Sequence, residues 1–179
     1  PYFIKQNISI NSGITLEIRE GTQIILSNGV NITNHGRLII QGSENKQVLF
    51  TSDSPENRWN YITNEGSLIA SHTMIRRAVR FVNSSGDTLI VEHCDISDTY
   101  GGAGDDCIAA HNAKKVVISN TSMTGNPETG KTDAIDLDGV SGGTVSGNTI
   151  FGYSDDGIDI GTSSSNMVVG ENAIQFCDM

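Results

Sequence analysis

Asp156-Gly157-Ile158-Asp159, near the end of the chain, repeats in altered form two earlier tetrapeptides, Asp133-Ala134-Ile135-Asp136 and Asp106-Cys107-Ile108-Ala109. Two further segments extend the series toward the N-terminus, Val79-Arg80-Phe81-Val82 and Trp59-Asn60-Tyr61-Ile62. From the earliest to the latest, the five segments begin 20, 27, 27 and 23 residues apart, and Asp178-Met179 begins another after 22 residues. Recurrence at this period indicates a solenoid in which each repeat forms one coil.

A second recurring pattern shows that the coils contain strands. In the last four repeats an apolar strand end, a turn and an apolar strand start follow one another, in Val91–Ile96, Ile118–Met123, Val145–Ile150 and Val169–Ile174. Apolar residues alternate with polar ones, which is the period of a strand. Strands this short cannot bury a face alone, so the repeats must stack. We therefore predict an all-β protein, a single-stranded right-handed parallel β-helix with three short strands per coil. A sandwich or jelly roll is the alternative fold.

One β-helix domain is expected over residues 1–179. Residues 1–58 carry looser strand patterns, which predict an N-terminal cap, with residues 1–10 as its candidate, followed by irregular early coils. Residues 59–179 are predicted to form regular coils of 20 to 27 residues. Because the sequence stops within a repeat, we expect a chain truncated at an uncapped C-terminal coil. An open strand edge is a template for pairing, so a homodimer through that coil is expected.

The charge balance limits the partners. The chain has 11 basic and 21 acidic residues and a formal net charge of −10. Such a field repels nucleic acid and anionic lipid, so no nucleic-acid partner is expected. No apolar run reaches the roughly 18 residues of a spanning helix, so no membrane insertion is expected. The acidity instead favours cations, or acidic polymers that are bound through bridging cations.

One turn position predicts a structural stack. The third residue of the turn pattern is Cys94, Thr121, Asn148 and Asn172 in successive repeats. Small or amide side chains at this position are expected to stack at the corner after the second strand of each coil. Stacked amides can hydrogen-bond along the axis and satisfy backbone groups at a tight corner.

Alternation assigns two faces to the first strand of each coil. The residues predicted to point inward are Phe81, Ile108, Ile135 and Ile158, with Ala110, Leu137 and Ile160 two positions later. The residues between them are predicted to face solvent, namely Arg80, Val82, Cys107, Ala109, His111, Ala134, Asp136, Asp138, Gly157, Asp159 and Gly161. This outer face would collect acids in the last two complete coils.

More acids precede the first strand of successive coils, at Asp105, Asp106, Asp133, Asp155, Asp156 and Asp178. Carboxylates aligned about 4.8 Å apart repel by about 3 kcal/mol at an effective dielectric near 20. A bound cation, a raised pKa, or aspartates that accept hydrogen bonds from turn amides would each relieve this repulsion. A calcium ion, which takes about six to eight oxygen ligands, can bridge carboxylates at this spacing. A calcium site and plain turn-forming aspartates are therefore the two interpretations.

Ser154-Asp155-Asp156-Gly157-Ile158-Asp159, together with Asp133 one coil earlier, resembles the calcium site of the pectate lyases built on a ten-coil right-handed β-helix. The resemblance covers about 30 residues, and it implies Asp133, Asp155, Asp156 and Asp159 as the ligands of a calcium ion that binds the uronate carboxylates of the substrate. The whole chain is more loosely similar to secreted β-helix proteins of the pectate-lyase-like superfamily. In the lyases a lysine of a following coil is the catalytic base, and this sequence ends before that position.

Other residues on the same side are weaker candidates. His111 would lie on the outer face one coil from Asp138, which could orient its imidazole, so His111 and Arg80 are the candidate catalytic residues. Asp136, Asp138 and Tyr100 are the candidate substrate-binding residues. The loops 97–104 and 125–131 are predicted to lie beside the acidic face, where a solenoid commonly builds a binding groove.

These observations favour a cation-assisted, carbohydrate-active β-helix domain that resembles a pectate or uronate lyase, with activity uncertain because the base position is missing. A non-catalytic structural, adhesion or glycan-binding module and a metal-dependent hydrolase remain alternatives. An acidic polysaccharide or other glycan is the expected partner, calcium the expected cofactor, and secretion from a bacterium or display on its surface the expected location.

Overall fold

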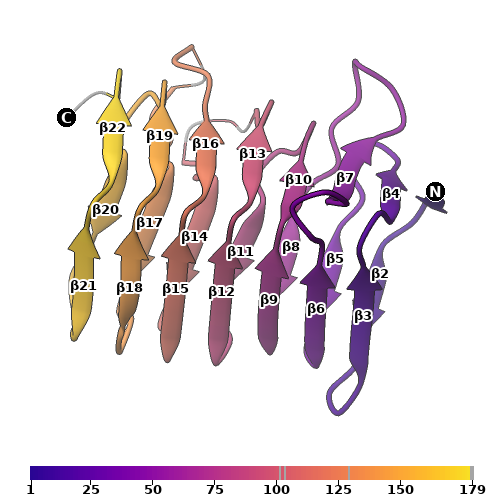
Figure 1. Cartoon of the computed structure of the whole chain (residues 1–179), viewed down its shortest axis with the longest axis horizontal. Helices are drawn as coiled ribbons and strands as arrows, with labels where there is room; N and C mark the ends of the chain where they lie inside the picture. The colour runs from indigo at the N-terminus through magenta and orange to yellow at the C-terminus, as the bar shows by residue number, and fades with distance from the viewer. Residues whose placement is uncertain (101, 103, 129, 178–179) are drawn as a thin grey trace.

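A computed structural model describes residues 1–100, 102, 104–128 and 130–177. Within these residues the chain forms strands and no helix, and it winds into a right-handed parallel β-helix of about seven coils. The coils lie side by side, with the two termini at opposite ends of the solenoid (Figure 1). The predicted fold class is confirmed. The described residues contain no helix with the length and hydropathy needed to cross a membrane.

Each coil contributes one strand to each of three parallel sheets, here called A, B and C. Sheet A contains β1 (Tyr2–Ile4), β4 (Gln23–Leu26), β7 (Val48–Ser52), β10 (Thr73–Ile75), β13 (Asp95–Ser97), β16 (Ser122–Thr124), β19 (Thr149–Phe151) and β22 (Ala173–Gln175). Sheet B contains β2 (Ile8–Ile10), β5 (Ile32–Asn34), β8 (Ile62–Asn64), β11 (Val82–Ser84), β14 (Ile108–His111), β17 (Ile135–Asp138) and β20 (Ile158–Ile160). Sheet C contains β3 (Thr15–Arg19), β6 (Arg37–Gln41), β9 (Ser67–Ser71), β12 (Thr88–Glu92), β15 (Lys115–Ser119), β18 (Gly143–Ser146) and β21 (Met167–Gly170).

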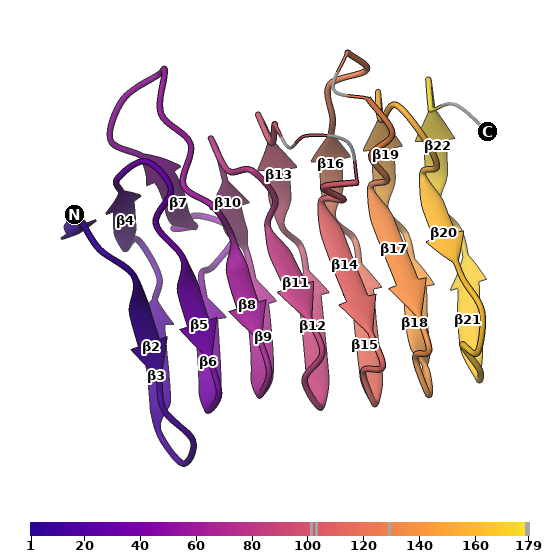
Figure 2. The same ribbon diagram turned by 180° about the vertical axis from the view of Figure 1, so that it is seen from behind.

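Sheet B, whose strands are labelled in Figure 2, holds the first strand of every predicted coil. It carries four of the candidate residues, His111, Asp136, Asp138 and Asp159. Its strands pair in register, so equivalent residues form columns along the axis. The inward column consists of Ile8, Ile32, Ile62, Val82, Ile108, Ile135 and Ile158. Branched apolar side chains that stack in this way bury the core face of each short strand against its neighbours.

The predicted corner stack is confirmed as a hydrogen-bonded ladder. The Cys94 N–H donates to Thr121 Oγ1 at 3.3 Å, and the Thr121 N–H donates to Asn148 Oδ1 at 3.0 Å. The Asn148 N–H then donates to Asn172 Oδ1 at 3.0 Å. Each side chain therefore satisfies the backbone of the coil before it.

Sheet B contains a second, buried polar stack that sequence reasoning missed. The Asn34 side chain donates to Asn64 Oδ1 at 2.7 Å, and the Asn64 side chain donates to Ser84 Oγ at 2.9 Å. All three residues are fully buried. Their side chains point into the core, where Ala110 and Leu137 continue the same column in later coils.

The predicted faces of the first strand need correction in two places. Phe81 does not align with Ile108, because the partner of Ile108 in the register is Val82. Both Phe81 and Val82 are fully buried. Two adjacent apolar residues satisfy an alternating pattern equally well, so the pattern could not choose between them. Several other residues predicted to face solvent are also buried, namely Cys107, Ala109, Ala134 and Gly157.

The reason differs between these residues. Cys107, Ala134 and Gly157 come just before β14, β17 and β20, where the chain is still turning and alternation does not apply. A Cβ at Gly157 would lie 2.5 Å from Ile174 Cγ2, which places this position against the core. Ala109 lies in the outer column and is nevertheless fully buried, so its short side chain is covered by its surroundings.

Residues 1–10, which sequence suggested as a cap, form β1 and β2 and pair in parallel with β4 and β5. They are thus the first rungs of sheets A and B. The expected further repeat at Asp178-Met179 lies outside the described residues.

Asn148→Ala should lower the free energy of unfolding by about 1 to 3 kcal/mol, because it leaves buried backbone groups without hydrogen-bond partners. Asn148 is 1% exposed and also donates to the Ile118 carbonyl oxygen at 2.9 Å. Urea unfolding measures the change. Asn45→Ala, at an exposed turn position, is the control and should change stability by less than about 0.5 kcal/mol. Equal effects of the two substitutions would contradict the role of the ladder.

Candidate functional site

The acidic residues of the last coils gather on and beside the outer face of sheet B. Asp136 in β17 pairs in register with Asp159 in β20, and Asp138 lies beside His111 of β14. Asp136 and Asp159 face outward because they alternate with the inward residues Ile135 and Ile158. The prediction that these aspartates share one face is therefore confirmed.

The acids that precede the strands form a second ladder. Asp106 Oδ1 accepts the N–H of Asp133 at 2.9 Å, and Asp133 Oδ1 accepts the N–H of Asp156 at 2.8 Å. Each carboxylate thus caps a backbone amide of the next coil, one of the three kinds of relief expected from the sequence. One oxygen of each carboxylate makes this hydrogen bond, and the other accepts none from the described residues.

Three of the four predicted calcium ligands come together. Asp133, Asp155 and Asp156 each offer one carboxylate oxygen within 4.8 Å of the others, and all three residues are partly buried. The Asp155 N–H donates to the Thr132 carbonyl oxygen at 3.2 Å, which ties this turn to the preceding coil. The spacing suits a cation that bridges two coils. We call Asp133, Asp155 and Asp156 the triaspartate group.

Asp159, the fourth predicted ligand, lies outside the triaspartate group as the structure describes it. Its carboxyl belongs to the outer column of sheet B, next to Asp136. Partial burial raises the pKa of Asp159, and the charges of Asp156 and Asp138 raise it further.

Two carboxyl groups of the site hold their protons unusually well. Burial raises the pKa of Asp133 to about 6, with a further contribution from the charges of Asp106, Asp155 and Asp156. Burial also raises the pKa of Asp136 to about 6, and the Asp106 charge adds to this effect. Burial is thus the main cause of both shifts, and neighbouring negative charges add to it.

His111 lies between two carboxylates. Its Nε2 is 3.7 Å from Asp136 Oδ2, and its Nδ1 is 3.8 Å from Asp138 Oδ2. The imidazole is 39% exposed, so solvent and ligands can reach it. The predicted proximity to Asp138 is confirmed, and Asp136 is an additional neighbour.

Arg80 is tied into the structure. Its guanidinium forms an ion pair with Asp105 and donates to the Gly104 carbonyl oxygen, while its Cζ lies 5.3 Å from the centre of the Tyr61 ring. The side chain is 11% exposed. A guanidinium held in this way stays charged and does not accept a proton. Arg80 therefore does not suit the role of a catalytic base that sequence suggested for it.

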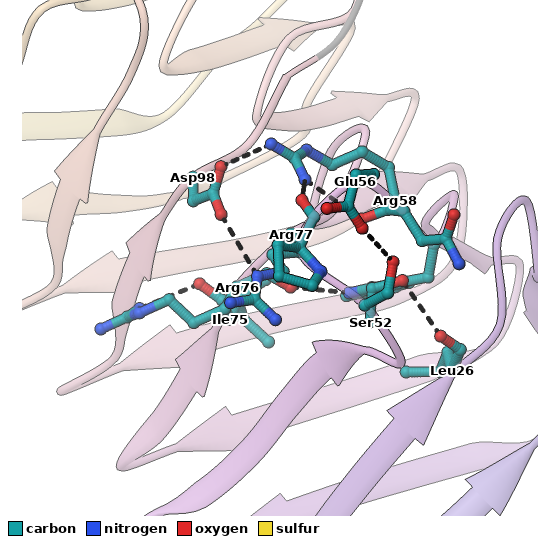
Figure 3. A network of polar contacts seen from close by, with 12 residues as sticks. Leu26, Ser52, Glu56, Arg58, Ile75, Arg76, Arg77 and Asp98 are labelled. Atoms are coloured by element: carbon teal, nitrogen blue, oxygen red, sulfur yellow. Dashed lines mark hydrogen bonds and ion pairs between the residues drawn. The ribbon is translucent and has the colours of Figure 1, made fainter.

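Other arginines on the same side are also paired. Arg58 Nη2 is 2.8 Å from Asp98 Oδ1, and Arg77 Nε is 3.8 Å from Asp98 Oδ2, so both converge on one carboxylate (Figure 3). Arg76 pairs with Asp95 at 2.5 Å. These cations neutralise acids of the middle coils and do not reach the triaspartate group.

Two described residues of the loops beside the face are relevant to the site. Tyr100, in the connection between β13 and β14, is 50% exposed, and its N–H donates to the Ala78 carbonyl oxygen. Lys131, in the connection between β16 and β17, has its Nζ 4.0 Å from Asp155 Oδ2 and is 86% exposed. Tyr100 remains available to a ligand but is not brought to the acids by any contact.

Sequence reasoning recognised Asp106 as part of the acidic series but did not choose it for the site. Its place in the ladder depends on which amide its carboxylate caps, and spacing alone does not show this. In the structure Val82 pairs with Ile108, so Arg80 occupies the position equivalent to Asp106. The sequence prediction had aligned Phe81 with Ile108, one residue away from this register.

A hollow of about 550 Å³ lies at the other end of the solenoid from the acidic face, among apolar residues that include Tyr2, Phe3 and Leu16. This hollow is therefore separate from the acidic face.

A family model described as the right-handed β-helix region matches residues 61–178. The chain belongs to this family. The match covers the coils that carry the acidic face and includes every candidate site residue. Comparisons with curated proteins and with solved structures gave no match. Membership of the β-helix family explains the fold. Any activity must be argued from the residues of the site.

Asp133→Asn should stabilise the protein relative to wild type as the pH rises from about 4 to about 6 in the absence of divalent cations. The pKa of Asp133 rises from 3.8 to about 6 on folding, so the folded state binds the proton more tightly and loses stability as that proton leaves. Asparagine keeps an oxygen for the Asp156 N–H and carries no charge. Chemical unfolding of both proteins across this range measures the difference. A difference that is constant with pH would contradict the raised pKa.

Proposed function

We propose that this β-helix domain binds an acidic polysaccharide on the outer face of sheet B, with calcium as the bridge between protein and polymer. The observation that carries the proposal is the triaspartate group, in which carboxylate oxygens from two consecutive coils lie within 4.8 Å of one another. This function places the domain outside the cell or on its surface, where such polymers occur.

Calcium suits the triaspartate group better than magnesium. Three carboxylates supply hard oxygen ligands, and calcium accepts an irregular set of about six to eight oxygens. Magnesium demands near-octahedral geometry and retains its waters. A bound cation would also compensate the charge that raises the pKa of Asp133. The positions left open on the ion would be available to carboxylates of a uronate polymer.

An acidic polymer needs this bridge because the protein itself is strongly acidic. A formal charge of −10 repels a polyanion in the absence of a cation. Aspartates follow one another along the axis on the outer face of sheet B, from Asp136 to Asp159. A polymer that lies across consecutive coils can therefore meet repeated sites. Tyr100, half exposed in the adjoining loop, offers a ring on which a sugar can stack.

A lyase is the second candidate function, and the position of His111 favours it. In uronate elimination a bound cation would withdraw charge from the substrate carboxylate and acidify the neighbouring C–H. A base would remove that proton, and the linked sugar oxygen would leave as the C=C bond forms. Arg80 is held in an ion pair, so of the two catalytic candidates His111 is the one able to accept a proton. Its exposed imidazole lies on the same face as Asp136.

Calcium should raise the melting temperature of the cation-free protein. A ligand that binds only the folded state stabilises it by about 2.7 kcal/mol at 100 times its dissociation constant. Asp155→Asn should remove most of the shift, because it removes one of the three carboxylate ligands. The Asp155 carboxylate caps no amide in the described part of the chain, so the substitution should leave the fold intact. Asp87→Asn, which changes an exposed aspartate paired with Lys114, should keep the shift. Identical melting curves with calcium and with chelator would rule out the calcium site.

Calcium-dependent retention on immobilised polygalacturonate should separate the candidate functions. Wild-type protein is expected to bind in calcium and to elute with chelator, and Asp155→Asn is expected to pass through. The ultraviolet absorbance of an unsaturated product in the same mixture would show a lyase, and its loss in His111→Asn would identify the base. New reducing ends without that absorbance would show a hydrolase. Binding without either product identifies a non-catalytic module, and no binding rejects the proposed ligand.

A further inference from the structure

Two histidine–carboxylate pairs lie in one column at the end of the sheet B strands. His111 pairs in register with Asp138 of the next coil. His35 and Glu65 follow Asn34 and Asn64, which are also partners in the register, so they occupy the same column in earlier coils. In both pairs the histidine belongs to one coil and the acid to the next. The earlier pair is therefore an internal reference for the later one.

The earlier pair is a simple ion pair. His35 Nδ1 lies 2.9 Å from Glu65 Oε2, at hydrogen-bonding distance. The outward residue two positions before Glu65 is Thr63, which carries no charge. Among the described residues, Glu65 is thus the one carboxylate paired with His35.

The later pair differs because a second carboxylate replaces the threonine. Asp136 occupies the position that corresponds to Thr63, so His111 faces Asp136 and Asp138 together. Its nitrogens stay 3.7 and 3.8 Å from the two carboxylates, beyond hydrogen-bonding distance. No hydrogen bond to either carboxylate forms within the described part of the chain. Asp136 nevertheless has a side chain that is only 15% exposed.

This spacing suits a metal ion. One nitrogen of His111 and one oxygen from each aspartate lie within 4.8 Å of one another. A tetrahedral ion with bonds of about 2.0 to 2.1 Å holds its ligand atoms roughly 3.3 Å apart. Small side-chain rotations would bring the three donors to that separation. The exposed side of the imidazole leaves room for a water molecule as the fourth ligand.

The position of Asp138 depends on the glycine in the next coil. A Cβ at Gly161 would lie 1.7 Å from Asp138 Oδ1, so the carboxylate occupies space that any other residue at 161 would fill. The lack of a side chain at Gly161 thus leaves room for the Asp138 carboxylate in its position near His111.

We propose that His111, Asp136 and Asp138 form a second metal site, which takes a transition-metal dication such as Zn²⁺. Imidazole nitrogen is a ligand for zinc and its neighbours in the first transition row, whereas calcium and magnesium take oxygen. The triaspartate group offers only oxygen, so the two sites differ in the metal that each prefers. A zinc-bound imidazole nitrogen cannot take a proton, so zinc would inhibit any elimination in which that nitrogen of His111 is the base.

Calorimetric titration of cation-free protein with Zn²⁺ tests the proposal. Wild type should show a site that His111→Asn weakens by more than about tenfold, since loss of even an outer-shell partner weakens metal sites by about 10- to 100-fold. His35→Asn is the matched control, because it removes an imidazole from the same column without a second carboxylate. The proposal fails if zinc does not bind, if His111→Asn binds as wild type does, or if both variants lose the same affinity.

Two further variants distinguish this site from the calcium site and from unspecific imidazole binding. Gly161→Ala should displace the Asp138 carboxylate and weaken zinc binding with His111 unchanged. Asp155→Asn should lose the calcium-induced stabilisation and keep the zinc site, so the two proposals fail separately.

Resonances of the His111 imidazole should shift on zinc addition, as NMR would show. Those of His72 and His93, whose rings stack at 4.9 Å, should not. Equal shifts at all histidines would identify surface binding and overturn the proposal.

Discussion

In-register parallel pairing places each residue about 4.8 Å from its counterpart in the next coil, and every column of the solenoid must tolerate that closeness. A column of branched apolar residues, such as Ile62, Val82 and Ile108, gains packing from it. A column of polar or charged residues loses stability unless hydrogen bonds, protons or ions compensate. A polar column that is fully compensated inside the protein has a structural role. A polar column that is not fully compensated can bind a ligand.

Three columns illustrate the difference. The corner stack that contains Thr121 and Asn148 is compensated inside the protein, because each side chain receives a backbone N–H from the neighbouring coil. The column of Asp106 and Asp133 is compensated in part, since each carboxylate uses one oxygen to cap an amide. The Asp136 carboxylate has no such donor in the described residues, and burial raises its pKa to about 6. The first column is thus closed to an external cation, whereas the second and third keep carboxylate oxygens that a cation could bind.

The sequence predicted the coils, the corner ladder and the acidic face because each depends on a repeated spacing. It did not settle the alignment of Phe81 and Val82, since both residues satisfy alternation and both are buried. Nor did it predict the buried polar stack that includes Asn34 and Asn64, because an asparagine pattern at a strand end also describes an exposed turn. Asp106 caps the N–H of Asp133, and this role depends on the direction of a hydrogen bond, which only the three-dimensional structure shows. Spacing therefore predicts columns, and geometry is needed to show what each column does.

The distribution of charge along the axis explains why the last coils hold the candidate sites. Residues 1–80 contain 8 basic and 6 acidic residues, whereas residues 81–179 contain 3 basic and 15 acidic residues. The arginines that end the first group pair with acids of the middle coils, as Arg76 does with Asp95 and Arg80 with Asp105. After them no arginine follows in the sequence, and the lysine nearest the triaspartate group is 86% exposed at 4.0 Å. An ion pair of this kind contributes little, because water screens it. The aspartates of the last coils thus retain charge that side chains elsewhere neutralise, and a bound cation is the compensation that their geometry allows.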